Sequence, residues 1–192
     1  MVEKNLYIIS GCNGAGKTTA SYTILPEILK CKEFVNADEI AKGLSPFNPE
    51  GVAAEAGRIM LNRIEELLSK GITFAIETTL ATKSFKNLIT KAQISGYKVH
   101  LIFFWLENPD LAVQRVKERV LKGGHNIPTE VIFRRYGAGI TNLFKIYLQL
   151  VDIWMIYDNS KPPRQFVAYG AKDVQSEILS HHIFNKIKRY VK

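Results

Sequence analysis

One segment near the start of the chain has glycines, a lysine and a hydroxyl residue at the spacing of a phosphate-binding loop. Residues 11–18 read Gly-Cys-Asn-Gly-Ala-Gly-Lys-Thr, which fits the pattern G-x-x-x-x-G-K-[ST]. Glycines allow such a loop to turn its backbone N–H groups toward phosphate oxygens, and the positive end of the following helix adds to the attraction. An apolar run at 6–9 precedes the loop and a helical segment follows it, as this mechanism requires. The segment therefore predicts a nucleoside triphosphate site.

Two side chains of this loop are predicted to contact the nucleotide in addition to its backbone N–H groups. Lys17 is expected to reach the β- and γ-phosphates, and the Thr18 hydroxyl is expected to ligate Mg²⁺. Cys12 is not expected to bind the ligand, but its thiol is expected to be open to modification. The complete set of predicted nucleotide contacts is Gly11, Asn13, Gly14, Ala15, Gly16, Lys17, Thr18 and Thr19.

Two carboxylates follow predicted strands. They therefore lie at the carboxyl ends of the strands, where open α/β sheets bind ligands. Asp38 comes after the apolar run at 34–35, and it could take the proton of an acceptor hydroxyl, as a kinase requires. The alternative is that Asp38 only caps a short helix beginning at Glu39. Glu77 follows the run at 72–76 and could hold a Mg²⁺-bound water or a substrate hydroxyl, or could be a plain surface carboxylate.

Three further residues belong to these strand-end clusters. Thr79, close to Glu77, is predicted to contact the substrate together with Arg134. Asp158 and Asn159 follow the run at 153–157 and could touch the nucleotide base. Because turn-forming residues are common after any strand, a plain turn is the alternative at this last position.

The segment 115–136 has the pattern of a basic lid. Arg115 and Arg119 are four residues apart and share a helix face, and a glycine-rich tip at 123–126 then interrupts the helix. Arg135 lies on the second arm, and Arg119 and Arg135 are the preferred cations for stabilising a transferring phosphoryl group. A helical hairpin with solvated arginines is the alternative. His125 at the tip could contact phosphate or could simply be a turn residue.

Short apolar runs alternate with amphipathic helical stretches along the chain, which favours a parallel sheet with both faces covered. Ala56, Met60, Ile64 and Leu67 form one such helical stripe, and Asn108-Pro109 predicts the start of another helix. The runs predicted as strands are 6–9, 34–35, 72–76, 99–106, 153–157 and 166–169. His100 falls within a run and is expected to be a core residue. The pattern predicts one P-loop NTPase domain over 1–192, a three-layer αβα sandwich of the kinase type.

The composition is that of an ordinary globular protein rather than of a membrane-spanning one. The chain has 192 residues, 46% of them hydrophobic and 23% charged, as in ordinary globular proteins. With only two cysteines and no stretch of about 20 apolar residues, it is expected to be cytoplasmic, with no membrane partner. The net charge is +8, of which residues 161–192 carry +5, and a basic helix is predicted over about 173–190. An excess of positive charge favours the binding of phosphate-bearing ligands or of nucleic acid.

The order of these motifs resembles the zeta-toxin-like family of P-loop kinases over roughly residues 5–160. The phosphate loop is followed by Asn-Ala-Asp at 36–38, Ser-Pro-Phe-Asn-Pro-Glu at 45–50, Glu-Thr-Thr-Leu-Ala at 77–81 and Gly-Gly-His-Asn-Ile-Pro at 123–128. The resemblance implies ATP- and Mg²⁺-dependent phosphorylation of a small-molecule hydroxyl, which in zeta toxins belongs to UDP-N-acetylglucosamine. It also implies a protein antitoxin as partner, although no antitoxin-like segment is visible in this chain.

Under the same resemblance, the family's catalytic base matches Asp38, its loop lysine matches Lys17 and its substrate-side acid matches Glu77. Its lid arginines map onto Arg119 and onto Arg134 or Arg135. Two other functions are compatible with these motifs: a nucleotide-dependent protein that binds nucleic acid through the basic tail, and a nucleotide-gated regulatory partner without catalysis. The first is disfavoured because basic and aromatic residues do not interleave as in RNA-binding segments.

Overall fold

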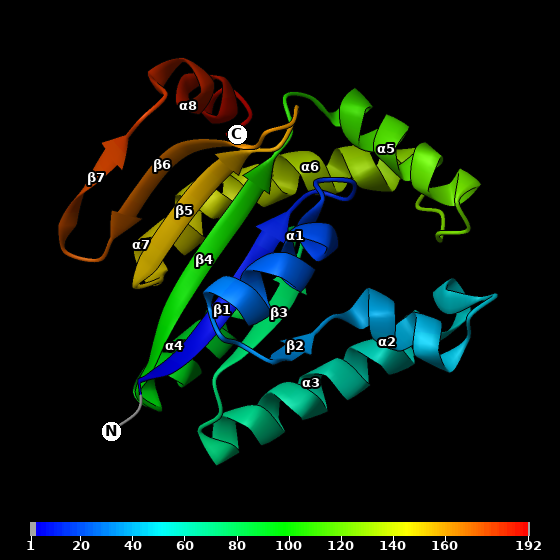
Figure 1. Cartoon of the computed structure of the whole chain (residues 1–192), viewed down its shortest axis with the longest axis horizontal. Coiled ribbons are helices and arrows are strands. Elements are labelled where there is room, and N and C mark those ends of the chain that lie inside the picture. The colour runs from blue at the N-terminus through cyan, green and yellow to red at the C-terminus, as the bar shows by residue number, and fades with distance from the viewer. Residues whose placement is uncertain (1–2, 192) are drawn as a thin grey trace.

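The computed structural model describes residues 3–191, which form a seven-stranded sheet with helices on both sides (Figure 1). The strands are β1 (Lys4–Gly11), β2 (Glu33–Val35), β3 (Phe74–Thr78), β4 (Tyr97–Trp105), β5 (Ile153–Asp158), β6 (Gln165–Ala171) and β7 (Val174–Ile178). Their order across the sheet is β2-β3-β1-β4-β5-β6-β7. Strands β1 to β5 are mutually parallel, so the predicted parallel sheet is confirmed for these five.

The last two strands form an antiparallel edge that the sequence did not indicate. Strand β6 pairs antiparallel with β5, and β7 pairs antiparallel with β6. The connection at 159–164 contains no helix, whereas a parallel pairing needs a crossover of a dozen or more residues. The strand predicted at 166–169, at the edge of the sheet, is therefore present, but it runs in the opposite direction to β5 and is not the edge strand, because β7 pairs along its other side.

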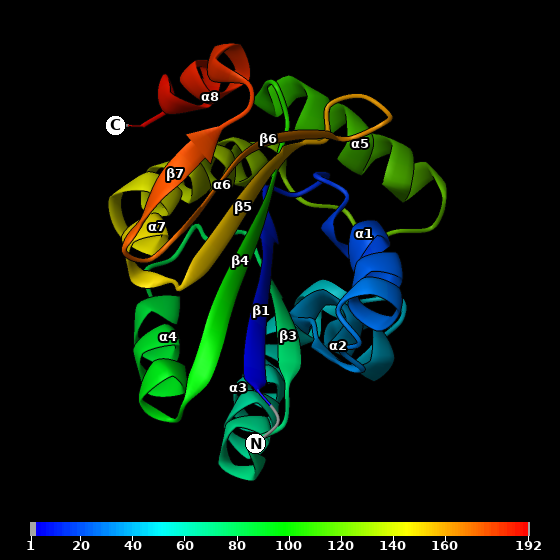
Figure 2. The same cartoon turned by 60° about the vertical axis from the view of Figure 1, so that its left-hand side comes forward.

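Helices cover the parallel part of the sheet. They are α1 (Lys17–Thr23), α2 (Ala37–Leu44), α3 (Ala53–Lys70), α4 (Phe85–Ile94), α5 (Pro109–Leu121), α6 (Thr129–Asn142) and α7 (Leu148–Leu150), with the π-helical turns η1 (Ile24–Ile28) and η3 (Leu143–Tyr147) and the 3-10 turn η2 (Pro49–Val52). Helix α8 (His181–Lys188) packs against the antiparallel strand β6. Helix α1 lies in front of the sheet in Figure 1 and α4 and α6 lie behind it. The rotated view of Figure 2 shows the same separation, with α1 and α2 on one side and α4, α6 and α7 on the other. Among the described residues, no helix is both long and apolar enough to cross a membrane.

Hydrophobic periodicity accounts for the position of the core. The side chains of Leu6, Ile8 and Ile9 in β1 are fully buried, and the α3 stripe from Ala56 to Leu67 packs inward as predicted. Helix α5 begins at the expected site, because the Asn108 side chain accepts a hydrogen bond from the Leu111 backbone N–H at 2.8 Å. Burial of apolar surface on both faces thus fixes the central strands in place.

The C-terminal segment differs from its prediction. A helix was expected over 173–190, but β7 occupies the first part of that range and α8 begins only at His181. The basic residues of the tail are consequently divided among the loop at 161–164, the β6–β7 hairpin and α8 with its C-cap residue Arg189, and Lys192 lies outside the described residues. The structure therefore offers no single long basic helix in the part of the tail that it describes.

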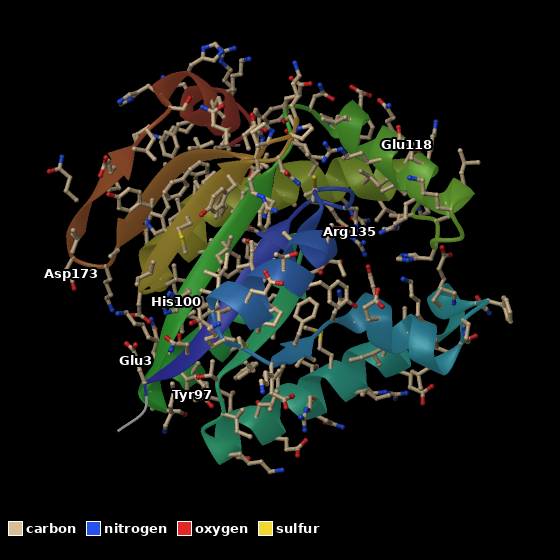
Figure 3. All side chains as sticks on the ribbon, in the orientation of Figure 1. Glu3, Tyr97, His100, Glu118, Arg135 and Asp173 are labelled. Atoms are coloured by element: carbon tan, nitrogen blue, oxygen red, sulfur yellow. The ribbon has the colours of Figure 1, made fainter. Side chains whose placement is uncertain are left out.

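His100 in β4 is half-buried and not part of the core, so the prediction of a core residue is wrong, but its side chain has the hydrogen-bond partner that was expected. Its Nε2 lies 2.8 Å from the Asn5 Oδ1 atom of the neighbouring strand. Burial lowers the pKa of this imidazole below its usual value. Figure 3 shows His100 and Tyr97 toward one end of the sheet, whereas Arg135 and Glu118 lie toward the other, where the parallel strands end.

Close packing of α6 against the segment after β3 gives a first prediction. A methyl group at Gly139 would lie 2.5 Å from the Thr79 carbonyl oxygen, a backbone atom that cannot move freely. We expect Gly139→Ala to lower the free energy of unfolding by about 1–3 kcal/mol in a urea titration. Gly137→Ala in the same helix is the matched control, since nothing lies within 4 Å of its added methyl group. Equal stability of the two variants would contradict the packing described here.

Candidate functional site

The phosphate-binding loop lies where the mechanism requires it, between the end of β1 and the start of α1. Gly16 has a φ of 78°, in the left-handed region that favours glycine, and a methyl group there would lie 2.6 Å from the Asn159 side-chain nitrogen. That nitrogen donates a hydrogen bond of 2.8 Å to the Ala15 carbonyl oxygen. The loop is therefore held in its curved form by a residue that follows β5.

Lys17 is held inside the loop by two oxygen atoms. Its Nζ donates to the Cys12 carbonyl oxygen at 3.1 Å and lies 3.4 Å from Glu77 Oε1. Both side chains of this ion pair are less than a tenth exposed. A buried cation at this position can exchange its carboxylate partner for phosphate oxygens, which are also anionic.

Glu77 connects the ends of three neighbouring strands. Its Oε2 atom accepts hydrogen bonds from the Thr18 hydroxyl at 2.8 Å and from the Asn36 side-chain amide at 2.9 Å. Glu77 lies in β3 opposite Ile9 of β1, while Asn36 directly follows β2. The carboxylate is thus not a plain surface group. We call these contacts among Lys17, Thr18, Asn36 and Glu77 the Glu77 cluster.

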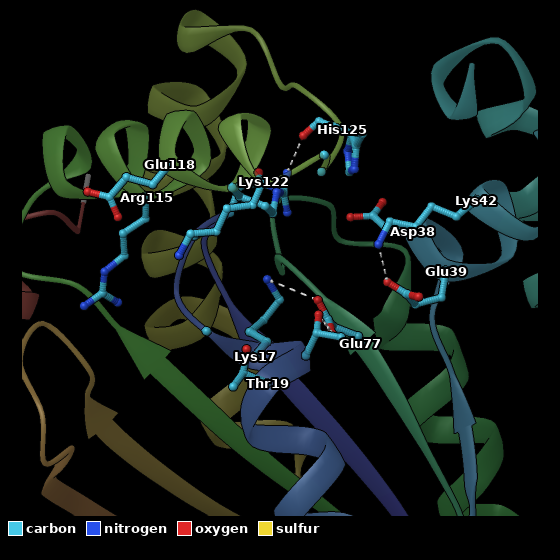
Figure 4. Close-up of a pocket in the computed structure, with 17 residues that line it drawn as sticks. Lys17, Thr19, Asp38, Glu39, Lys42, Glu77, Arg115, Glu118, Lys122 and His125 are labelled. Atoms are coloured by element: carbon cyan, nitrogen blue, oxygen red, sulfur yellow. Dashed lines mark hydrogen bonds and ion pairs between the residues drawn. The ribbon is translucent and has the colours of Figure 1, made fainter. Parts of the chain in front are cut away.

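Asp38 lies at the first turn of α2, and it is not the cap of that helix. The cap is Asn36, whose Oδ1 accepts from the backbone N–H groups of Asp38 at 2.9 Å and Glu39 at 3.4 Å. The alternative in which Asp38 serves as the cap is therefore wrong. Figure 4 shows the Asp38 carboxylate pointing into the cleft between His125 and Glu77.

Two adjoining cavities meet at Asp38 and His125. The larger, of about 590 Å³, is bounded by the phosphate-binding loop, by α2 and by α5 with the tip of the hairpin (Figure 4). The smaller, of about 240 Å³, lies between α2, the η2 turn and the start of α6. The larger volume falls within the range of about 300–1,000 Å³ that is typical of small-molecule sites. Lys17 and Asp38, predicted to act together, line the same cavity.

The hairpin of α5 and α6 brings three of its four arginines to these cavities. Arg115 and Arg119 line the larger cavity and Arg135 lines the smaller. Arg115 donates to the Ser160 carbonyl oxygen at 3.0 Å, and Arg135 donates to the Asn13 side-chain oxygen at 3.4 Å. Arg134 is exposed and lines neither cavity, so its predicted contact with substrate has no counterpart in this arrangement.

Arg119 fixes the tip of the hairpin. Its Nη2 donates to the His125 carbonyl oxygen at 2.9 Å, while its buried Nε has no hydrogen-bond partner among the described residues. Burial is the main cause of a lowered pKa at His125, with Asp38 acting against the shift and Arg119 acting with it. The imidazole is therefore mainly neutral at pH 7 and lies at the boundary between the cavities.

Several predicted residues have roles other than those expected, or lie outside the cavities. Thr19 lines the larger cavity, whereas Thr79 lines neither and its hydroxyl accepts from the Ala81 backbone N–H at 3.5 Å. Asp158 accepts from the Ser160 backbone N–H at 2.8 Å, which is the turn role given above as the alternative for this position. Asn159, as described above, supports the phosphate-binding loop.

Residues that the sequence did not single out also line the cavities. Lys42 and Glu39 form an ion pair of 3.0 Å on α2 and face the larger cavity. Glu50 faces the smaller one, from the η2 turn. Glu50 lies in the 45–50 motif that carries the family resemblance, but nothing in its spacing assigned it a role.

Comparison with known proteins relates this arrangement to a family. The family model described as Zeta toxin matches residues 2–164. An uncharacterized protein of Haemophilus influenzae is 28% identical over 143 residues, which cover 71% of this chain and 100% of that protein.

Solved structures share the fold at low sequence identity. A crystal structure of AvrRxo1-ORF1:-ORF2 with ATP matches with a TM-score of 0.78 at 16% identity, covering 96% of this chain and 63% of that chain. A structure from the PezAT chromosomal toxin-antitoxin system of Streptococcus pneumoniae matches with a TM-score of 0.69 at 16% identity, covering 100% of this chain and 79% of that one. A putative kinase from Chloroflexus aurantiacus gives 0.56 at 19% identity, covering 71% and 78%. The chain spans less than two thirds of the AvrRxo1 chain that it matches, and its fold is that of P-loop kinases.

The cysteines give a prediction that corrects the expected accessibility of Cys12. Its side chain and that of Cys31 are buried, and burial raises the pKa of each thiol to about 11. Because the thiolate is the reactive form, we expect neither cysteine to react with a disulfide reagent at pH 7.5 in the folded protein. Both should react after unfolding in urea, which serves as the control. Rapid labelling of one thiol in the folded protein would contradict this description of the loop.

Proposed function

The chain belongs to the zeta toxin family, and on this premise we propose that it transfers the γ-phosphoryl group of ATP to a hydroxyl group of a small molecule. The observation that carries the proposal is the convergence of Lys17 and Asp38 on one cavity. A carboxylate that faces the phosphate loop across a cleft is where a kinase needs the base that takes the proton of the acceptor hydroxyl. Both the family membership and the cavity shared by loop and carboxylate support the assignment.

In this proposal Asp38 accepts the proton of the attacking hydroxyl, since it is an exposed carboxylate at the junction of the two cavities. The oxygen then attacks the γ-phosphorus in line, and ADP leaves. Lys17 and the loop N–H groups stabilise the negative charge on the phosphates. Arg119 and Arg135 approach from the hairpin and stabilise the charge on the moving group.

The residues of the Glu77 cluster fit a magnesium ion. Hydroxyl and carboxylate oxygens are the ligands that this hard cation prefers, and it usually takes few protein ligands besides substrate phosphates and waters. Among the described residues no group of three or more His, Cys, Asp or Glu side chains could hold a metal alone. The Thr18 hydroxyl would bind the ion and Glu77 would hold it through a water. When bound, the ion would neutralise charge on the β- and γ-phosphates.

The finer parts of the proposal come from family membership. UDP-amino sugars are the acceptors to be tested first on that basis. A protein antitoxin is the proposed partner, because one structural match belongs to a toxin-antitoxin system. The cytoplasm is the proposed compartment, since both cysteines are free thiols.

Asp38→Asn is the variant that tests the base. The amide is nearly the same size but cannot accept the proton, so we expect transfer to fall by at least about 10²-fold. The affinity for ATP, measured by calorimetry, should stay within a factor of about three. Asp173→Asn is the matched control, because that exposed residue lies far from the cleft (Figure 3). Undiminished transfer by Asp38→Asn would remove Asp38 from the mechanism.

The hairpin arginines provide an internal comparison. Arg119→Ala and Arg135→Ala should each lower kcat by about 10²–10³-fold, which is typical of losing one group that stabilises transition-state charge. Arg134→Ala, adjacent in sequence but outside both cavities, should retain kcat within a factor of about two. Steady-state rates of ADP formation with an identified acceptor measure the effect. A large loss in Arg134→Ala with none in Arg135→Ala would reverse the assignment.

A further inference from the structure

We propose that His125 is a further catalytic residue of the transfer, whose imidazole donates a hydrogen bond to an oxygen atom of the γ-phosphoryl group as that group moves from ATP to the acceptor. The inference rests on the proposed function, since it adds one residue to the same reaction. It applies to any acceptor hydroxyl, because it concerns the group that is transferred. Three features support it: the position of the imidazole, its free nitrogen atoms and the contacts that hold its backbone.

The imidazole lies on the path that the proposed reaction gives to the phosphoryl group. Among the described residues, His125 and Asp38 are the two that line both cavities. In the proposed reaction the phosphates of ATP lie at Lys17 in the larger cavity, and the acceptor hydroxyl lies beside Asp38. In Figure 4 His125 lies on the hairpin side of the cleft, opposite Lys17 and Glu77. A group in transit from Lys17 toward Asp38 therefore has His125 as a neighbour.

The ring nitrogens of His125 are free to bind a ligand. The residue is half-buried, and within the described part of the chain neither ring nitrogen has a hydrogen-bond partner. The imidazole of His100 differs, because it lies 2.8 Å from the Asn5 side-chain oxygen. One nitrogen of a neutral imidazole carries a hydrogen that it can donate, and phosphate oxygens are strong acceptors. A phosphoryl oxygen would therefore supply the partner that the protein does not.

Contacts within the hairpin tip hold the backbone of His125 in place. The Arg119 side chain donates to the His125 carbonyl oxygen at 2.9 Å, and the Gly124 N–H donates to the Arg119 carbonyl oxygen at 2.9 Å. A methyl group at Gly124 would lie 2.5 Å from the Arg119 Cγ atom, so the tip is in close contact with α5. On the other side, Ile127 is buried in the core. The imidazole is thus presented to the cleft from a fixed backbone, as a preorganised donor requires.

The surroundings of His125 keep it in the neutral form. Burial is the main cause of its lowered pKa, and Arg119 and Lys42 act in the same direction. Asp38 and Glu50 act against the shift. His125 neither gains nor loses a proton in the proposed step. The acceptor oxygen forms the new bond to phosphorus, the bond from phosphorus to the ADP oxygen breaks, and the acceptor proton goes to Asp38.

The first test measures binding and needs no identified acceptor. The probe is ADP with Mg²⁺ and aluminium fluoride, which imitates the phosphoryl group in transit, and calorimetry compares the native protein with His125→Ala. The affinity of the variant for this complex should fall by about 10–100-fold, as expected for losing one hydrogen bond to a charged group. Its affinity for ATP with Mg²⁺ should stay within a factor of about three, because the contact belongs to the transition state. A loss for the fluoride complex no larger than the loss for ATP would overturn the proposal.

The second test uses variants that keep an N–H group and so separate hydrogen bonding from proton transfer. The amide of His125→Asn replaces Nδ1 and that of His125→Gln replaces Nε2, and neither amide takes up a proton. With an identified acceptor, His125→Ala should lower kcat by about 10–100-fold and leave the KM of the acceptor within a factor of about three. At least one amide variant should restore kcat to within about fivefold of the native value.

The controls separate these effects from misfolding. The melting temperature of each variant is measured, and His182→Ala is the matched control, because that exposed histidine lines neither cavity. If both amide variants are as slow as His125→Ala, hydrogen-bond donation is not the role of this residue. A rise in the acceptor KM with unchanged kcat would also overturn the proposal, because it would place the imidazole against the acceptor instead.

Failure of the proposed function gives a different result from failure of this inference. If aluminium fluoride does not raise the affinity of the native protein for ADP with Mg²⁺, the kinase assignment falls and this inference falls with it. If the native protein shows the added affinity and His125→Ala keeps it, the kinase assignment stands and the role of His125 alone is wrong. Lys17→Ala, titrated in parallel, should lose affinity for both ligands, which identifies the phosphate-binding loop as their common site.

Discussion

The geometry of the site depends on the contacts that the Glu77 carboxylate makes. It pairs with Lys17, accepts from the Thr18 hydroxyl and accepts from the Asn36 amide, so one side chain joins the ends of β1, β2 and β3. Asn36 in turn caps α2 and thereby fixes the direction in which Asp38 leaves the helix. Buried charges are tolerated only when they are paired and hydrogen-bonded, which the Glu77 cluster achieves. The phosphate loop and the proposed base are thus positioned by the same few contacts.

The fold places these contacts beside two adjoining cavities that together form one cleft. The parallel strands bring the loop, Asp38 and Glu77 together at their carboxyl ends. The hairpin of α5 and α6 covers this end of the sheet with arginines. Both cavities are lined by charges of both signs. Glu77 and Glu118 lie beside the cations of the cavity next to the loop, and Arg135 lies beside Asp38 and Glu50 in the other cavity.

Sequence patterns predicted the features that are determined by contacts between residues close together in the chain. The glycine spacing of the loop, the Asn108 helix cap and the apolar strand runs each follow from contacts close in sequence, and the structure contains them. The antiparallel edge of β6 and β7 could not be predicted in this way, because strand direction depends on a long-range pairing. The same limit applies to the roles of Asn159 and Glu50, which arise only when distant segments meet at the cleft. Burial of the Cys12 side chain within the loop is likewise a property of the packed structure.

Calorimetric titration of ATP in the presence and absence of Mg²⁺, for the native protein and for Glu77→Gln, tests the central role of the Glu77 cluster most directly. The account predicts that Mg²⁺ raises the affinity of the native protein for ATP by at least about tenfold. In Glu77→Gln this increase should shrink to less than about threefold, while the affinity for metal-free ATP is kept or raised because a negative charge beside the phosphates is gone. An unchanged Mg²⁺ effect in Glu77→Gln would contradict the account.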